Sequence, residues 1–219
     1  MSRKVAILGG LGNATVVAAA IEHARRLGAT DLEVAGFLND REPIGKQLDM
    51  FPVIGRVEDA KKLLDEGYWF INTIFRIDGN RERIAMFEAL NIPDDRLATF
   101  VHPMAYVAPS VQLGAGCVIM PNVSMSPGTV LGKGCIMMAG SMMGHDNRVG
   151  AFCHIAAQSA VGSYLTIGKG VHIGLNATVR EYLTIGDYAT LGAGAVLTKN
   201  IGEGEIWAGN PAKFLRKAE

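Results

Sequence analysis

The chain has 219 residues, with 21 basic and 21 acidic side chains, a formal net charge of zero and 49% hydrophobic residues. The balanced charge argues against binding to nucleic acid or to an anionic membrane surface, because both need clustered positive charge. The hydrophobic content is sufficient for a buried core and excludes a disordered chain. No apolar run reaches the roughly 18 residues of a membrane span, and the apolar stretch near the N-terminus is too short for a secretory signal.

The charges are unevenly distributed along the chain. Residues 1–102 carry 28 of the 42 Asp, Glu, Lys and Arg side chains, whereas residues 107–202 carry only eight. This break in composition near His102-Pro103 predicts two domains, residues 1–102 and residues 103–219.

The first domain alternates between strand-like and helix-like segments. The predicted elements, in chain order, are strand 4–8, helix 13–27, strand 32–38, helix 57–66, strand 69–75 and helix 81–90. Asn13 is expected to cap the first helix and Gly28 to end it. The alternation predicts a small Rossmann-like parallel sheet flanked by helices, with a ligand site in the crevice at the carboxyl ends of the strands.

The second domain is a six-residue repeat. Sixteen consecutive positions, each six residues after the last, are all aliphatic or Met: Val107, Leu113, Ile119, Met125, Leu131, Met137, Met143, Val149, Ile155, Val161, Ile167, Ile173, Val179, Ile185, Leu191 and Leu197. The residue that follows is Gly in nine of the sixteen hexads. This pattern is typical of a parallel β-helix, in which each hexad supplies a short strand and a corner, and the repeated apolar side chain points inward.

Four further motifs accompany the repeat: His102-Pro103, Val107-Ala108-Pro109-Ser110-Val111, Gly144-His145-Asp146 and Gly209-Asn210-Pro211-Ala212-Lys213. Together with the hexads they resemble the hexapeptide-repeat sugar acyltransferases, in the branch that holds the sialic acid O-acetyltransferases and the N-acetyltransferases of nucleotide-linked amino sugars. The resemblance covers almost the whole chain. It implies a left-handed β-helix, a cytoplasmic homotrimer and acetyl-CoA bound between neighbouring helices.

The same resemblance implies that three hexads close one coil of 18 residues, and the cysteines agree with this period. Cys117, Cys135 and Cys153 are spaced 18 and 18 apart, all at the fifth position of their hexads. We therefore expect one interior ladder, which makes a catalytic or metal role improbable. Three cysteines cannot all pair, and their spacing matches no zinc site, which fits a reducing cytoplasm.

His145 occupies the third position of its hexad and is expected on the outside of the coil. A lone outward histidine is usually an ordinary surface residue. The resemblance identifies His145 as the catalytic general base and Asp146 as the acidic neighbour that strengthens it. Because adjacent strand residues point to opposite faces, the two side chains can meet only at a coil corner.

The other four histidines have simpler interpretations. His23 is expected on the exposed side of the first helix, and His102, which precedes a proline, is expected to cap the domain junction. His154 and His172 are 18 residues apart and should stack on successive coils at an outward position. By resemblance His154 lines the acetyl-CoA site, and we expect it to approach His145 only across a subunit interface.

The resemblance also places the substrates. The matching acetyl-CoA contacts besides His154 are Ser163, Gly174, Leu175, Ala193 and Lys213. The candidate acceptor contacts are Leu11, Gly12 and Asn13, then Asn39 and Asp40 after the second strand, and Arg76 and Arg81 for a pyrophosphate. Relatives that bind nucleotide sugars usually have Ser-Gly-His-Gly where this chain has Leu11-Gly12-Asn13-Ala14, so the acceptor's identity stays open.

The predicted function is an acetyl-CoA-dependent N-acetyltransferase that acts on an amino sugar, with the sugar carried by a nucleotide. A sugar O-acetyltransferase of the sialic-acid type is the alternative. A metal-dependent hydratase on the same β-helix would need three converging histidines, two of them five residues apart, and no such pair exists in the sequence, so no metal is expected. A non-enzymatic β-helix would leave both the His-Asp pair and the appended first domain unexplained.

Overall fold

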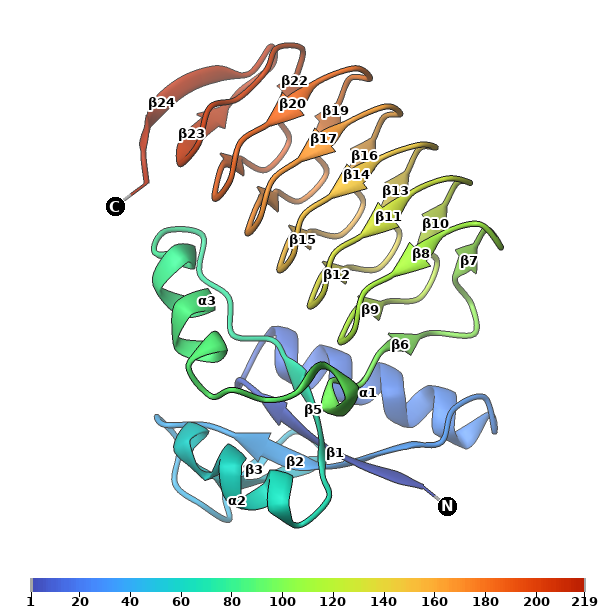
Figure 1. Cartoon of the computed structure of the whole chain (residues 1–219), viewed down its shortest axis with the longest axis vertical. Coiled ribbons are helices and arrows are strands. Elements are labelled where there is room, and N and C mark those ends of the chain that lie inside the picture. Colours follow the sequence, from blue (N-terminus) through green and yellow to red (C-terminus); the bar gives the residue numbers. More distant parts are fainter. Residues whose placement is uncertain (1, 219) are drawn as a thin grey trace.

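The computed structural model describes residues 2–218. It divides into a small α/β layer structure and a parallel β-helix that lies above it in Figure 1. None of the helices within residues 2–218 is long and apolar enough to cross a membrane.

The α/β part has one five-stranded sheet in the order β3-β4-β2-β1-β5. Its strands are β1 (Arg3–Leu8), β2 (Leu32–Leu38), β3 (Gln47–Leu48), β4 (Phe51–Gly55) and β5 (Trp69–Asn72). All neighbours pair in parallel except β3 and β4, which form an antiparallel pair. Sequence patterns did not predict β3 and β4, because Pro52 and Gly55 are residues that strands usually avoid.

The helices are α1 (Asn13–Arg26), α2 (Ala60–Asp65), which follows a 3₁₀ turn over Val57–Asp59, and α3 (Asn80–Glu88). Side chains alternate across β1: Val5 and Ile7 pack in the cluster that contains α1, whereas Ala6 and Leu8 pack with α2 and α3. The predicted capping role of Asn13 is wrong. Gly12 is the N-cap residue, and Asn13 is the first helical residue, with its side-chain amide turned toward the β-helix.

The β-helix has three parallel sheets, one for each side of the coil, built from two-residue strands. The first sheet holds β7 (Tyr106–Val107), β10 (Ser124–Met125), β13 (Met142–Met143), β16 (Ala160–Val161), β19 (Thr178–Val179) and β22 (Val196–Leu197). The second holds β8 (Gln112–Leu113), β11 (Val130–Leu131), β14 (Arg148–Val149), β17 (Thr166–Ile167) and β20 (Thr184–Ile185). The third holds β6 (Phe100–Val101), β9 (Val118–Ile119), β12 (Ile136–Met137), β15 (His154–Ile155), β18 (His172–Ile173), β21 (Thr190–Leu191), β23 (Glu205–Ala208) and β24 (Lys213–Lys217).

The predicted 18-residue coil is confirmed by the register of these strands. Ile136 pairs with His154, and His154 pairs with His172. The second residue of each pair, which is the repeated apolar position, is buried from Ile119 onward. Cys117, Cys135 and Cys153 form the expected interior ladder and are all free thiols.

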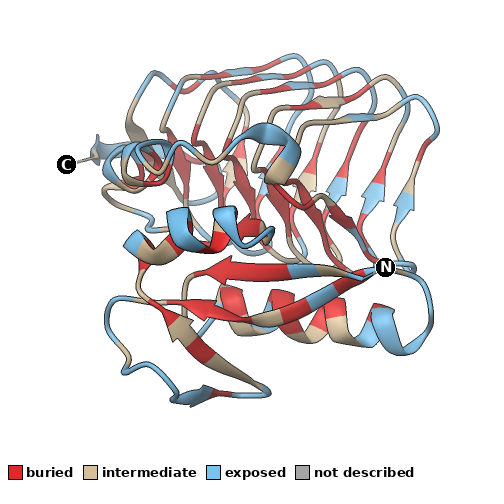
Figure 2. Cartoon of the chain, turned by 60° about the horizontal axis from the view of Figure 1, so that its bottom comes forward, coloured by how far each residue is buried: buried red, intermediate tan, exposed pale blue. Residues whose placement is uncertain are grey.

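The third sheet is the one that faces the α/β part, and Figure 2 shows buried residues concentrated on that side of the β-helix. Its outward positions are buried: Phe100, Val118, Ile136, His154, His172 and Thr190. At the equivalent positions of the first sheet, Tyr106 and Met142 are exposed. The two parts are also joined by polar contacts, including Asn80 Nδ2 to the Gly170 carbonyl oxygen at 2.7 Å. The α/β part therefore covers one of the three sides of the coil and leaves two uncovered.

Candidate active site

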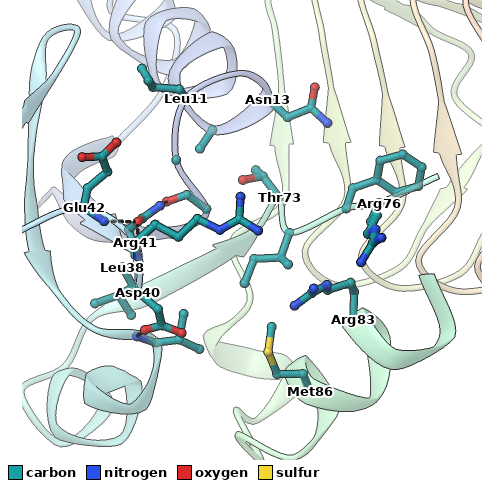
Figure 3. A pocket seen from close by; sticks show the side chains of 17 residues that line it. Leu11, Asn13, Leu38, Asp40, Arg41, Glu42, Thr73, Arg76, Arg83 and Met86 are labelled. Carbon is teal, nitrogen blue, oxygen red and sulfur yellow. Dashed lines mark hydrogen bonds between the residues drawn. The ribbon is translucent and has the colours of Figure 1, made fainter. Parts of the chain in front are cut away.

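A cavity of about 700 Å³ lies where the carboxyl ends of β1, β2 and β5 meet, at the crevice predicted from the sequence. Its lining includes Gly9-Gly10-Leu11 and Asn13 from the loop and helix that follow β1 (Figure 3). The two glycines are required by close packing. A Cβ on Gly9 would collide with Thr73 Oγ1, and one on Gly10 would collide with the side-chain amide of Asn39. The loop backbone thus runs along the cavity wall, where N–H groups are available to a ligand.

Asn39 and Asp40 both line this cavity, but each also holds the protein together. Asn39 Nδ2 donates to the Gly9 carbonyl oxygen at 3.0 Å, and its Oδ1 accepts hydrogen bonds from two backbone amides of the following turn. Asp40 Oδ1 accepts a hydrogen bond from the Val57 backbone N–H at 2.9 Å. This polar pair therefore shapes the cavity as well as offering oxygen atoms to it.

Positive charge enters the cavity from the side of β5 and α3. Arg76 and Arg83 both line it, and Figure 3 shows their guanidinium groups close to each other. Arg81, the second arginine named from the sequence, lies elsewhere: its guanidinium stacks on Tyr188 at 4.2 Å and pairs with Glu203. Arg83 was missed because two residues separate neighbouring turns of opposite helix faces, and the face of a short helix is decided only by what it packs against.

His145 and Asp146 lie at the corner between β13 and β14, as predicted for a pair of adjacent residues that meet. Asp146 has a φ of 56°, the left-handed conformation that turns the chain. His145 Nδ1 contacts Asp146 Oδ2 at 2.8 Å, and the side chains are 47% and 49% exposed. Because the carboxylate can only accept, Nδ1 carries a proton and donates it, which leaves the lone pair of the neutral ring on Nε2. This is the arrangement of a general base with an orienting acid.

His154 and His172 stack as predicted, with ring centroids 5.2 Å apart, but the α/β part buries them. Phe75 lies over both rings, at 4.6 Å from His154 and 4.8 Å from His172. Asn13 Nδ2 contacts His154 Nε2 at 3.1 Å, and the Nδ1 atoms of the two rings are 3.3 Å apart. Burial lowers the pKa of His154 to about 3, with a further contribution from His172, and lowers the pKa of His172 to about 4. Both rings are therefore neutral at physiological pH.

Acidification is accordingly expected to destabilise the folded protein through these two residues. An unfolded histidine titrates near pH 6.5, so between pH 6.5 and 4 the unfolded chain binds more protons than the folded one. The stabilisation is complete above about pH 6.5 and is lost as the pH falls, by up to about 1.4 kcal/mol per pH unit for each histidine. Denaturant unfolding at pH 7 and pH 5 measures this loss. His172→Phe should reduce the difference between the two pH values, and an unchanged difference would contradict the assignment.

The two remaining histidines are placed as expected. His102 is buried, and its Nδ1 accepts a hydrogen bond from the Met104 backbone N–H, which is a capping role. Burial and the nearby His23 lower the pKa of His102. His23 is exposed on α1, and its Nδ1 contacts His102 Nε2 at 2.9 Å.

The candidate acetyl-CoA contacts fall at two different corners of the chain. Ser163 lies next to His145 and accepts a hydrogen bond from the His145 backbone N–H through Oγ at 3.1 Å. Gly174, Leu175 and Ala193 share another corner, where a Cβ on Gly174 would meet the backbone of Ala193 and Leu175 is 57% exposed. Lys213 is exposed on β24. Within residues 2–218 no group of three His, Cys, Asp or Glu side chains is arranged to hold a metal ion.

Known proteins share this architecture over the whole chain. A family model described as the hexapeptide repeat of succinyl-transferase matches residues 164–199. The acetyltransferase domain of PglB from Neisseria gonorrhoeae FA1090 is 34% identical, with a TM-score of 0.83 and coverage of 98% of this chain and 100% of that chain. That domain has also been solved in complex with acetyl coenzyme A. No curated protein matches the sequence significantly.

A second solved structure adds a nucleotide sugar. A histidine-to-asparagine mutant of perosamine N-acetyltransferase from Caulobacter crescentus, solved with CoA and GDP-perosamine, is 30% identical, with a TM-score of 0.83 and coverage of 98% of this chain and 97% of that chain. WeeI from Acinetobacter baumannii AYE, at 19% identity and a TM-score of 0.76, shares the fold. These similarities confirm the predicted fold class, a small Rossmann-like α/β domain followed by a left-handed β-helix of hexapeptide repeats.

Proposed function

Because the chain belongs to the hexapeptide-repeat sugar acetyltransferases, we propose that it transfers the acetyl group of acetyl-CoA to the amino group of a nucleotide-linked amino sugar. The observation that carries this proposal is the His145–Asp146 pair at an outward corner, with Nδ1 and Oδ2 2.8 Å apart. The similar chains support the substrates, since one was solved with acetyl coenzyme A and the other with CoA and GDP-perosamine.

His145 acts as the general base of the transfer. The acceptor nitrogen attacks the thioester carbonyl, a C–N bond forms, and the N–H proton passes to His145 Nε2. The C–S bond then breaks, and the departing CoA thiolate takes that proton, which returns the imidazole to its neutral form. Asp146 keeps Nδ1 protonated throughout and stabilises the imidazolium that exists between the two proton transfers.

The acceptor's nucleotide occupies the cavity at the end of the α/β sheet. A volume of about 700 Å³ is within the range of small-molecule sites. Arg76 and Arg83 supply the charge and the paired N–H donors that bind a diphosphate well. Asp40, together with the backbone of Gly10 and Leu11, contacts the base or ribose, and Asn39 holds that wall in place.

The complete site is formed between subunits of a homotrimer. His145 is not among the residues that line the acceptor cavity of its own chain, so an acceptor held there reacts at the His145 of a neighbour. An acetyl-CoA molecule that touches both Ser163 and the Gly174–Leu175 corner must likewise lie in a groove between two coils. The uncovered sheets support this assembly, because Tyr106 and Met142 leave apolar surface exposed. The three free, buried cysteines support a reducing compartment such as the cytoplasm.

A panel of acceptors tests the proposal. The purified protein is incubated with acetyl-CoA and, separately, with amino sugars linked to GDP, UDP or dTDP, with the same sugars lacking the nucleotide, and with sialic acid. Free CoA thiol and product mass are measured. We expect thiol release and an N-acetyl product with a nucleotide amino sugar. Transfer only to a sugar hydroxyl would favour the O-acetyltransferase alternative, and the absence of transfer together with no CoA-induced rise in Tm would reject acetyl transfer altogether.

A further inference from the structure

One corner of the β-helix carries an unusual column of residues. Gly128, Asp146, Tyr164 and Tyr182 lie 18 residues apart on successive coils, with φ values of 75°, 56°, 58° and 61°. This left-handed conformation is cheap for glycine and tolerable for asparagine or aspartate, but it is unfavourable for a bulky residue. The backbone therefore does not account for tyrosine at two consecutive levels of the column.

Core packing does not account for the two tyrosines either. Phe152 and Tyr188 also adopt the left-handed conformation, but they pack against the α/β part, on Phe87 and Arg81 respectively. Tyr164 and Tyr182 are 47% and 70% exposed. Their rings stack on each other, with centroids 4.9 Å apart and an interplanar angle of 8°.

The other neighbour of Tyr164 is His145. The two rings meet edge to face, with centroids 4.8 Å apart and an interplanar angle of 85°. The Tyr164 backbone N–H also donates to the His145 carbonyl oxygen at 3.1 Å, while Ser163 Oγ accepts from the His145 backbone N–H. Residues 163 and 164, one coil further along, thus hold the backbone of His145 from both sides and cover one side of its ring.

This contact matters because the imidazole has little other support. His145 is half exposed, and the hydrogen bond to Asp146 is its one side-chain polar contact among the described residues. Exposed side chains change rotamer within picoseconds to nanoseconds, and a single surface hydrogen bond restrains them weakly. A general base acts only from within hydrogen-bond reach of the proton that it removes.

We propose that Tyr164 is a positioning residue for His145, with Tyr182 as its support. The Tyr164 ring keeps the imidazole in the rotamer in which Nδ1 meets Asp146 and Nε2 is available to the acceptor. The role lies in the ring face and edge, not in the phenol oxygen. This inference rests on the proposed function in so far as His145 is the base of that reaction.

Tyr164→Asn tests the inference, because asparagine tolerates the left-handed backbone and removes the ring. We expect kcat to fall by about tenfold, the scale expected when a catalytic group is less well oriented, while KM for both substrates and Tm change little. Tyr164→Phe should restore most of kcat, and Tyr182→Asn should lower it less than Tyr164→Asn does. If Tyr164→Asn fails to fold, Tyr164→Gly, which relieves the backbone, replaces it.

Three results would overturn the inference: an unaltered kcat in Tyr164→Asn, a rise in KM for acetyl-CoA at constant kcat, or an equal loss in Tyr164→Phe. Crystal structures of wild type and Tyr164→Asn give a readout that does not need activity. The inference requires His145 in one rotamer in the wild type and in two or more in the variant. If the wild type shows no transfer, the proposed function fails, and the rotamers alone still decide whether Tyr164 holds the ring.

Discussion

His145→Ala is expected to lower kcat by about 10²- to 10⁴-fold, the contribution typical of a well-placed general base. The alanine variant has no group that can take the proton from the attacking nitrogen or return one to the leaving thiolate. The substrates themselves should bind almost as in the wild type, because the acceptor cavity does not include His145 and the His145 backbone contact to Ser163 is retained. Steady-state kinetics give kcat, and calorimetric titration with CoA gives the affinity.

The chain offers a matched control for this substitution. His23 is also an exposed histidine, but it lies on α1 and contacts His102. His23→Ala should keep the wild-type kcat. Asp146→Asn, which removes the charge behind Nδ1, should reduce kcat by less than His145→Ala does. Full turnover in His145→Ala would refute the assignment of the base.

The double variant Arg76→Gln/Arg83→Gln is expected to raise KM for the nucleotide sugar by about 100-fold or more. A hydrogen bond to a charged group contributes about 1.5–3 kcal/mol, so losing one from each arginine costs at least about 3 kcal/mol. The KM for acetyl-CoA should change little, because neither arginine is among the candidate acetyl-CoA contacts. Kinetics with each substrate varied in turn separate the two effects.

Arg81→Gln tells the two versions of this site apart. The sequence alone nominated Arg81 for the pyrophosphate, whereas in the structure its guanidinium lies on Tyr188 and Glu203. If the structural placement is right, Arg81→Gln raises the acceptor KM far less than the double variant does. An equal rise in the two proteins would mean that the cavity described here is not where the diphosphate binds.

Mixing the two inactive proteins examines the site between subunits. When His145→Ala and Arg76→Gln/Arg83→Gln chains are unfolded together and refolded, mixed trimers contain interfaces with an intact cavity on one chain and an intact His145 on the next. Activity should therefore return in the mixture. If the mixture stays inactive while co-refolded wild type recovers its activity, the cavity and His145 act within one chain.

The amino-acid sequence by itself determined the β-helix in detail. Its period is a local property, because the same apolar position recurs every six residues and residues 18 apart pair without an insertion. The interior cysteine ladder and the outward corner position of His145 follow from that register alone. In the α/β part, strand-like runs such as 32–38 were predicted with their observed bounds, since a buried parallel strand is a continuous apolar segment.

The tertiary structure alone decided how the two parts meet and which side chains face the cavity. Asn13 and His154 are 141 residues apart, and no periodicity relates them. His154 and His172 occupy outward positions that any isolated coil would expose, and they are buried because Phe75 lies over them. The choice of Arg83 over Arg81 depends on the rotation of α3, which is set by Asn80 and Ile84 where they contact the β-helix. Local patterns encode the strands and the coil, whereas side-chain orientation at a domain junction depends on the packing of both partners at once.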